Sequence, residues 1–312
     1  MKQYILTIAI LMFSLNVLAQ QKSGNNTIND GQSNFVSPRS SFDGADQPGI
    51  SVIAHDFNTK GVKKALIEKN YEEATKLFRQ AVESDRNCFP CQYNLGMSLI
   101  KNENYDESIK IFTNLTSINP RDANFQSGLG EAYHKKGLYK ESIAPFEKAA
   151  ILEPRDADNL SNLGNALYQI KEYDQALIYL DKALKINPKL LAAHSNRGAT
   201  LHALGRYKEA VKSLQHAVVL DPGSAEVQSN LGVALGSLGK EKEAHKCFLE
   251  ALRLRPKWDL GMYNLAMNYL KLGNRELAHQ QLSILQDVAP KLAQNLRKAY
   301  FGKYLIDVSD VK

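Results

Sequence analysis

The stretch ADNLSNLGNALYQIKEYDQALIYLDKALKINPKL, residues 157–190, combines apolar residues at helical spacing with a proline near its end. Prolines recur 34 residues apart along most of the chain, at Pro120, Pro154, Pro188, Pro222, Pro256 and Pro290. A fixed period of about 20 to 50 residues is the signature of a repeat array. Six of the ten prolines therefore mark one internal period.

With each proline taken as position 32, seven repeats stand in one frame without insertion or deletion. They begin at His55, Phe89, Ala123, Ala157, Leu191, Ala225 and Asp259. Position 8 is small in six repeats, position 20 is Ala or Ser in all seven, and position 24 is large and apolar. Glycines stand near position 15 at Gly137, Gly205, Gly239 and Gly273. Each repeat is therefore predicted to form a helix, a tight turn, a second helix and a proline-marked turn.

This pattern of Leu-Gly, Tyr, Ala, Phe, Ala and Pro resembles the tetratricopeptide repeat family. Seven repeats of 34 residues cover 238 of the 312 residues. The resemblance implies an all-α fold, an α-solenoid of seven helix-turn-helix repeats that forms a right-handed superhelix over residues 55–290. Three residues depart from the pattern. Arg86 replaces a proline, Val62 replaces the glycine of position 8 in the first repeat, and Pro145 lies inside a second helix, where we expect a local bend.

The ends of the array follow a different pattern. Leu292, Leu296, Ala299 and Tyr300 lie at helical spacing, which predicts a capping helix over residues 291–302 that covers the last repeat. Residues 303–312 are expected to form a loosely ordered tail. Residues 20–54, rich in Ser, Asn and Gly, cannot bury enough apolar surface to fold, so we expect a flexible spacer there.

The first 19 residues have the pattern of a secretory signal peptide. Lys2 precedes an apolar stretch from Tyr4 to Leu18, and Val17-Leu18-Ala19 matches a small-residue cleavage site. Roughly 15 apolar residues fall short of the ~20 that a spanning helix needs. We therefore expect cleavage after Ala19, a periplasmic or extracellular protein, and no integral membrane span in the mature chain.

The charge pattern argues against nucleic acid as a partner. The chain carries 39 basic and 33 acidic residues, a net charge of +6, with the two signs mixed along its length. A nucleic-acid-binding protein should also show a basic stripe or a recognisable reading module. The densest basic cluster, Arg253, Arg255 and Lys257, is interpreted as a solvated helix end.

One face of the first helices carries a repeated asparagine. Positions 4, 7, 8 and 11 form the packing stripe, which leaves positions 2, 6, 9 and 13 on the opposite face. Position 6 is asparagine in five repeats, although asparagine is a mediocre helix former. Its amide offers both a donor and an acceptor, as an extended peptide backbone does.

The resemblance suggests a role for these asparagines. In the superhelical repeats of O-linked N-acetylglucosamine transferases, a ladder of asparagines at this position grips peptide main chain in a concave groove. By that resemblance, and without any transferase domain, the groove candidates here are Asn94, Asn162, Asn165, Asn196, Asn230 and Asn264. The alternative is that asparagine is simply a frequent, solvated residue of the repeat. The cations with which other members capture acidic C-terminal carboxylates are missing from this face.

The three cysteines and seven histidines are the candidates for redox or metal chemistry. Cys88 and Cys91 form a C-x-x-C at a helix start, which redox pairs also use, but the surrounding pattern lacks strands and two cysteines are too few for zinc. In an oxidising compartment a local disulfide is the simplest outcome. Cys247 is expected to be buried in packing. His134 and His202, at position 12, are interpreted as surface residues, and no metal, cofactor or catalytic residue is predicted.

The sequence thus predicts a non-catalytic scaffold that holds an extended segment of another protein in its groove. An accessory or assembly factor of a cell-envelope complex, acting through the convex face or the termini, is the alternative. A thiol-disulfide redox protein using Cys88 and Cys91 ranks third. The partner, the biological process and the oligomeric state stay open.

Overall fold

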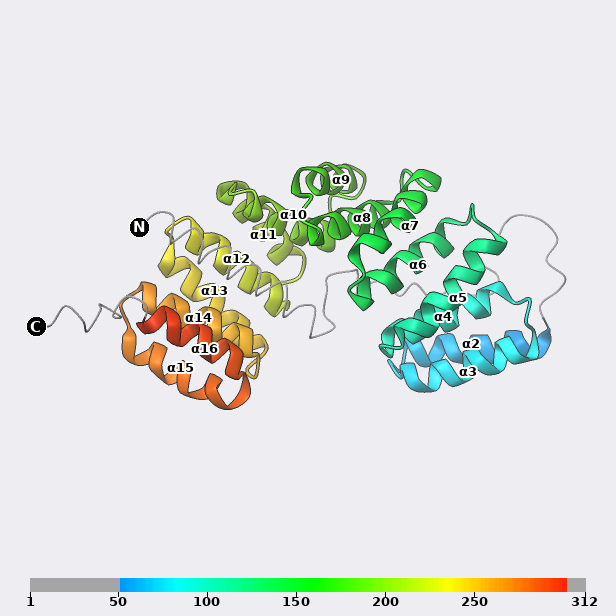
Figure 1. Ribbon diagram of the computed structural model, residues 1–312, viewed down its shortest axis with the longest axis horizontal. Coiled ribbons are helices and arrows are strands. Elements are labelled where there is room, and N and C mark those ends of the chain that lie inside the picture. Colours follow the sequence, from blue (N-terminus) through cyan, green and yellow to red (C-terminus); the bar gives the residue numbers. More distant parts are fainter. Residues whose placement is uncertain (1–50, 302–312) are drawn as a thin grey trace, which may run out of the picture. The chain divides into compact units, whose positions relative to one another are not determined.

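The computed structural model describes the backbone of residues 51–301 and the side chains of residues 51–298 (Figure 1). The predicted signal peptide, residues 20–50 of the predicted spacer, residue 302 and the predicted tail lie outside these described residues. Within residues 51–301, no helix combines the length and the apolar character that crossing a membrane requires.

The described residues form fifteen helices that alternate as the repeat pattern predicts. The first helices of the seven repeats are α2 (Val52–Leu66), α4 (Phe89–Lys101), α6 (Ala123–Lys136), α8 (Ala157–Gln169), α10 (Leu191–Ala203), α12 (Ala225–Ser237) and α14 (Asp259–Lys271). The second helices are α3 (Tyr71–Ser84), α5 (Tyr105–Ile118), α7 (Tyr139–Leu152), α9 (Tyr173–Ile186), α11 (Tyr207–Leu220), α13 (Glu241–Leu254) and α15 (Arg275–Val288). The last helix is α16 (Pro290–Phe301).

These helices divide into two compact units, one ending at Pro188 with α2 to α9 and one beginning at Lys189 with α10 to α16. In the first unit, each of the second helices α3, α5 and α7 packs between two first helices. Each first helix also packs against the first helix of the next repeat, as α2 does on α4, α4 on α6 and α6 on α8. The second unit repeats this arrangement with α11, α13 and α15. Each unit is therefore an α-solenoid in which the first helices form one layer and the second helices the other.

The turns follow from residues that cannot continue a helix. Gly137, Gly205, Gly239 and Gly273 adopt φ values of 73° to 87°, the left-handed region that glycine enters at no steric cost. The other three repeats place Lys69, Glu103 and Lys171 in the same region. At the opposite end of six of the repeats, proline lacks an N–H group and restricts the residue before it, so the second helix ends just ahead of it.

Small residues at position 8 let the two helices of a repeat approach closely, as predicted. A Cβ atom added at Gly96 would lie 2.7 Å from Cε2 of Phe112, the position 24 residue of its own repeat. One added at Gly128, in the next repeat, would lie 2.3 Å from Cε1 of the same ring. Phe112 is fully buried, so its ring is wedged between two helices whose backbones it touches.

The predicted frame is wrong in the first repeat by one residue. Gly61, and not Val62, packs on Phe78, since a Cβ at Gly61 would lie 2.6 Å from that ring. The turn after α2 contains one extra residue, because Asn70 N–H bonds the carbonyl six residues back whereas Asn104 N–H bonds the one five back. The shift moves position 1 to Ala54, so Val62 is no departure from the pattern. The helix itself begins two residues earlier, at Val52, inside the predicted spacer.

Two further expectations concern α7 and α16. Helix α7 continues without a break through Pro145, whose ring is buried. The capping helix forms as predicted, starting one residue early at Pro290, and it packs on α14 and α15. Leu296 is fully buried there and belongs to one apolar cluster with Leu282 and Leu285.

Candidate partner-binding face

In each unit, the candidate site is the face of the first helices that carries positions 2, 6, 9 and 13, here called the ladder face. All six groove candidates are buried side chains of first helices: Asn94, Asn162, Asn165, Asn196, Asn230 and Asn264. Burying an amide costs free energy unless its donor and acceptor find partners. The partners of each asparagine therefore decide whether it holds the array together or is available to a ligand.

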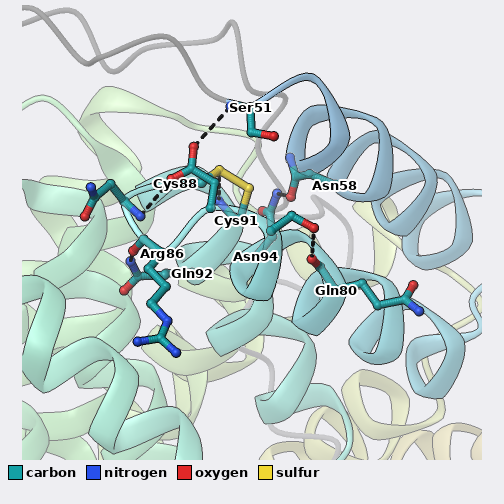
Figure 2. Close-up of a disulfide and its surroundings, with 11 residues drawn as sticks. Ser51, Asn58, Gln80, Arg86, Cys88, Cys91, Gln92 and Asn94 are labelled. Carbon is teal, nitrogen blue, oxygen red and sulfur yellow. Dashed lines mark hydrogen bonds between the residues drawn. A yellow bond between two sulfur atoms is a disulfide. The ribbon is translucent and has the colours of Figure 1, made fainter.

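Two of the six donate across the interface between neighbouring repeats. The Asn94 side-chain amide donates to Oδ1 of Asn58 on α2 over 3.0 Å, and both residues are fully buried (Figure 2). The Asn264 amide donates to Oγ of Ser229 on α12 over 2.9 Å. With the one-residue correction in α2, both acceptors stand at position 5 of the preceding repeat. These two asparagines thus fix one repeat against the next.

Sequence reasoning missed this second role, although a signal for it exists. Serine at position 5 is followed 35 residues later by asparagine at Ser229 and Asn264, and the same spacing separates Ser127 from Asn162 and Ser195 from Asn230. Comparing the same position across repeats does not pair position 5 of one repeat with position 6 of the next.

Helix α8 differs because two of its buried polar groups have no hydrogen-bond partner among the described residues. Ser161 Oγ and Asn165 Nδ2 are buried, and neither has a hydrogen-bond partner among the described residues. Ser161 is 1% exposed and Asn165 is 3% exposed. Within residues 51–298, the one hydrogen bond of the Asn165 side chain is long, with Oδ1 accepting from Gln169 Nε2 at 3.5 Å. A buried polar group without a partner costs about 1–3 kcal/mol, so α8 holds hydrogen-bonding capacity that the fold does not use.

The C-x-x-C motif forms a disulfide between Cys88 and Cys91 at the start of α4 (Figure 2). Cys88 is the N-cap of the helix, and the Cys91 N–H donates to its sulfur over 3.3 Å. Both cysteines are fully buried against Ala54 of α2 and Ala81 of α3. Thiol-disulfide exchange requires access to a sulfur atom, so this burial favours a structural role over a redox one.

The turn around the disulfide carries further bonds. The Ser51 N–H donates to Oδ2 of Asp85 over 3.1 Å, and Gln92 Nε2 donates to the Arg86 carbonyl over 2.7 Å. The bond from Ser51 joins the start of α2 to the α3–α4 turn, while the disulfide and the Gln92 bond hold that turn to the first residues of α4. Cys247 is half-buried, and burial, with a smaller effect of Glu243, raises the pKa of its thiol to about 11.

The two position 12 histidines are buried, so interpreting them as surface residues was wrong. His134 packs edge-on against Tyr139 at 5.0 Å between ring centroids, and neither of its nitrogens has a partner among the described residues. His202 shares a 2.8 Å hydrogen bond with Ser237 Oγ and packs on Tyr207. Burial lowers the pKa of each imidazole to about 3. A tyrosine at position 17, just after the turn, covers position 12 in both repeats.

Two arginines of the basic cluster formed by Arg253, Arg255 and Lys257 contact acidic and aromatic neighbours. Arg253 pairs with Glu250, while Arg255 pairs with Glu226 of α12 and lies over the Trp258 ring at 5.6 Å. Among the described residues, no three His, Cys, Asp or Glu side chains gather where they could hold a metal ion.

Family models of the tetratricopeptide repeat match residues 93–159, 155–222 and 189–257, which together span more than half of the chain. The chain belongs to the tetratricopeptide repeat family. No curated protein matches it. Members of this family are scaffolds for other proteins, and the fold described above is the one that the tetratricopeptide pattern implies.

Solved tetratricopeptide structures resemble the chain in fold. A repeat protein from Parabacteroides merdae has a TM-score of 0.62 at 14% identity, with 80% of this chain and 98% of that one covered. PilW, described as a widely conserved type IV pilus biogenesis factor, has a TM-score of 0.62 at 18% identity, with 67% and 98% covered. PilF of Pseudomonas aeruginosa has a TM-score of 0.58 at 16% identity, with 68% and 97% covered. At these identities the likeness concerns the fold alone.

Proposed function

We propose that the protein is a non-catalytic scaffold that binds an extended segment of a partner protein along its ladder face, with α8 as the main contact. The observation that carries this proposal is the pair of buried, unbonded groups on α8, Ser161 Oγ and Asn165 Nδ2. An amide N–H group without an acceptor is matched by a backbone carbonyl, and a hydroxyl can donate or accept.

Extended peptide suits this face better than a folded surface. A peptide in extended conformation presents an N–H and a carbonyl at every residue, so it can bond side chains that recur along a row of helices. Such recognition depends on main chain and tolerates different side chains. The asparagine that recurs at position 6 in five repeats fits that mode.

The test uses peptides selected from a displayed library of random 12-residue sequences on the full-length protein. Affinity of a selected peptide is measured by fluorescence anisotropy for wild type, Asn165→Ala and the double variant Ser161→Ala/Asn165→Ala. Loss of one buried hydrogen bond of about 1.4 kcal/mol corresponds to a tenfold weaker Kd. Asn114→Ala is the matched control, because Asn114 is an exposed asparagine on the second helix α5.

Two results would contradict the proposal: failure to select any peptide, or an α8 double variant that binds as tightly as Asn114→Ala. Replacing single peptide amides by esters adds a second test. An ester removes one donor and weakens one acceptor, so at least one replacement should reduce affinity if the main chain is recognised.

We further propose that the protein acts outside the cytoplasm. The secretory pattern of residues 1–19 and the buried disulfide between Cys88 and Cys91 support this location, because disulfides persist in oxidising compartments. Mass spectrometry of the protein purified from its native cell should find Gln20 as the first residue. Recovery of an intact N-terminus at Met1 would contradict this.

A further inference from the structure

The second unit carries the net positive charge of the described residues, although the two signs alternate along the sequence. Residues 189–298 include 16 basic and 9 acidic residues, a net charge of +7. Residues 51–188 include 18 basic and 19 acidic residues, a net charge of −1. Such a charge difference between two parts of one chain indicates contact with an anionic partner, and the side chains that produce it show where.

The excess cations lie on the outer faces of the second helices α11 and α13. Positions 18, 22, 25 and 29 of a second helix are four, three and four residues apart, so they share one face. On α11 these positions hold Lys208, Lys212, Gln215 and Val219, and on α13 they hold Lys242, Lys246, Leu249 and Arg253. All eight side chains are exposed, and both helices pack on α12. These eight residues are here called the basic face.

The basic face differs from the same positions of the other second helices, because it contains no acid. Each of the other five helices has at least one acid there, as at Glu72, Asp106, Glu147, Asp174 and Glu276. The acids next to the basic face are already paired, Glu209 with Arg206 over 2.7 Å and Glu243 with Lys240 over 2.9 Å. Within residues 51–298, its four lysines form no ion pair.

The fold itself does not account for these lysines. Position 18 lies in the first turn of the second helix, where the helix dipole favours an acid and disfavours a cation. Glu72, Asp106 and Asp174 follow this preference, whereas Lys208 and Lys242 oppose it. Since the lysines are exposed, they also have no role in packing. Their cost to the helix is offset only by a partner of opposite charge.

Exposed aliphatic side chains on the same face favour a lipid surface as that partner. Val219 is 78% exposed and Leu249 is 45% exposed. Lysines reach the phosphates of anionic headgroups while aliphatic side chains enter the boundary with the acyl chains. An acidic protein segment is recognised best by the planar fork of arginine. The single arginine of this face, Arg253, is paired with Glu250.

We propose that the basic face docks the protein onto the surface of a membrane that contains anionic phospholipid. The lysines supply the attraction to the headgroups, and Val219 and Leu249 add shallow insertion. This inference does not use α8, so it succeeds or fails separately from the proposed peptide binding.

The experiment is co-sedimentation with vesicles of phosphatidylcholine, either alone or with about 30% phosphatidylglycerol. The protein used begins at Gln20, because the apolar stretch of residues 4–18 would itself bind lipid. One variant changes the four lysines of the basic face to glutamine: Lys208, Lys212, Lys242 and Lys246. The control makes the same change in charge at exposed lysines of α3, α5 and α7: Lys76, Lys110, Lys140 and Lys148.

Wild type and the control should bind the anionic vesicles and release them as salt rises from about 0.1 to 0.5 M, because salt screens exposed charges. Each lysine near an anionic surface contributes about fivefold to the partition coefficient. The basic-face variant should therefore bind about a hundredfold more weakly or less. Equal binding by the two lysine variants, or equal binding to vesicles without phosphatidylglycerol, would overturn the proposal.

A second variant distinguishes a lipid surface from an acidic protein. Val219→Ser/Leu249→Ser keeps every charge, so it should bind anionic vesicles about tenfold more weakly and bind poly-L-glutamate as wild type does. Binding of poly-L-glutamate without binding of anionic vesicles would overturn the proposal and assign the basic face to an acidic protein. Vesicle binding that ignores the loss of both aliphatic side chains would contradict their insertion.

Discussion

The asparagines of α4 and α14 differ from the polar residues of α8, although all are buried on first helices. Asn94 and Asn264 each donate to a side chain of the preceding repeat, over 3.0 and 2.9 Å. Ser161 and Asn165 are as deeply buried and have groups that bond nothing among the described residues. Buried polar residues of the first helices thus hold repeats together in one place and keep their hydrogen-bonding capacity in another.

The largest effect is expected from acid, which acts on both units through buried histidines. His134 and His202 keep pKa values of about 3 when folded, whereas the unfolded chain takes up their protons below about pH 6.5. The unfolded state then binds more protons, so the free energy of unfolding falls as pH drops from about 6.5 toward 3. Each histidine should contribute up to about 1.4 kcal/mol per pH unit.

Urea unfolding at pH 7, 6 and 5 measures this loss, and His134→Phe should reduce its slope. The contrast between the two histidines sharpens the comparison, because His202 shares a hydrogen bond with Ser237 and His134 has no hydrogen-bond partner among the described residues. An unfolding free energy that is flat between pH 6.5 and 5 would contradict the burial of both.

The next largest effect on stability is expected at position 6 of the third repeat, where the asparagine is missing. Gly128 stands where five repeats have asparagine, and a Cβ there would meet the wedged Phe112 ring at 2.3 Å. Gly128→Asn should therefore destabilise the protein by about 1–3 kcal/mol through overpacking, with no gain in peptide affinity. Thermal unfolding and anisotropy measure the two quantities. A stable variant with tighter binding would show that the gap has no packing cause.

Removing a bonded ladder amide should cost stability and spare binding. Asn94→Ala leaves Asn58 fully buried with neither of its amide groups bonded, since Asn58 Nδ2 already has no partner among the described residues. We expect a loss of about 2 kcal/mol in urea unfolding and an unchanged Kd for a selected peptide. Asn114→Ala provides the control for an exposed asparagine. Equal stability of the two variants would contradict the claim that Asn94 holds neighbouring repeats together.

Removing the unbonded amide of Asn165 should reduce peptide binding and change stability least of all. Asn165→Leu replaces a buried donor without a partner by an apolar side chain of similar size, so the free energy of unfolding should stay level or rise by up to about 1 kcal/mol. Peptide affinity should fall about tenfold or more. A drop in stability with unchanged affinity would assign Asn165 to packing as well.

The helices could be predicted because proline, glycine and small residues mark each turn and each close contact by their own chemistry. The one-residue shift in the first repeat could not be predicted, because the prolines fix the frame at the ends of the second helices. Val62, the predicted position 8 residue, is next to Gly61, which makes the contact with Phe78. The burial of His134 could not be read from a helical wheel, since the covering ring of Tyr139 comes from beyond the turn. The bond from Asn94 to Asn58 links different columns of different repeats, which a search for repeated positions does not compare.

The two kinds of ladder asparagine can be distinguished in a single measurement. Full-length protein labelled with ¹⁵N at asparagine reports each side-chain amide as a separate pair of resonances, assigned by single substitution. On addition of a selected peptide, the Asn165 amide should shift while those of Asn94 and Asn264 stay in place. Shifts at Asn94 and Asn264 with none at Asn165 would contradict the account.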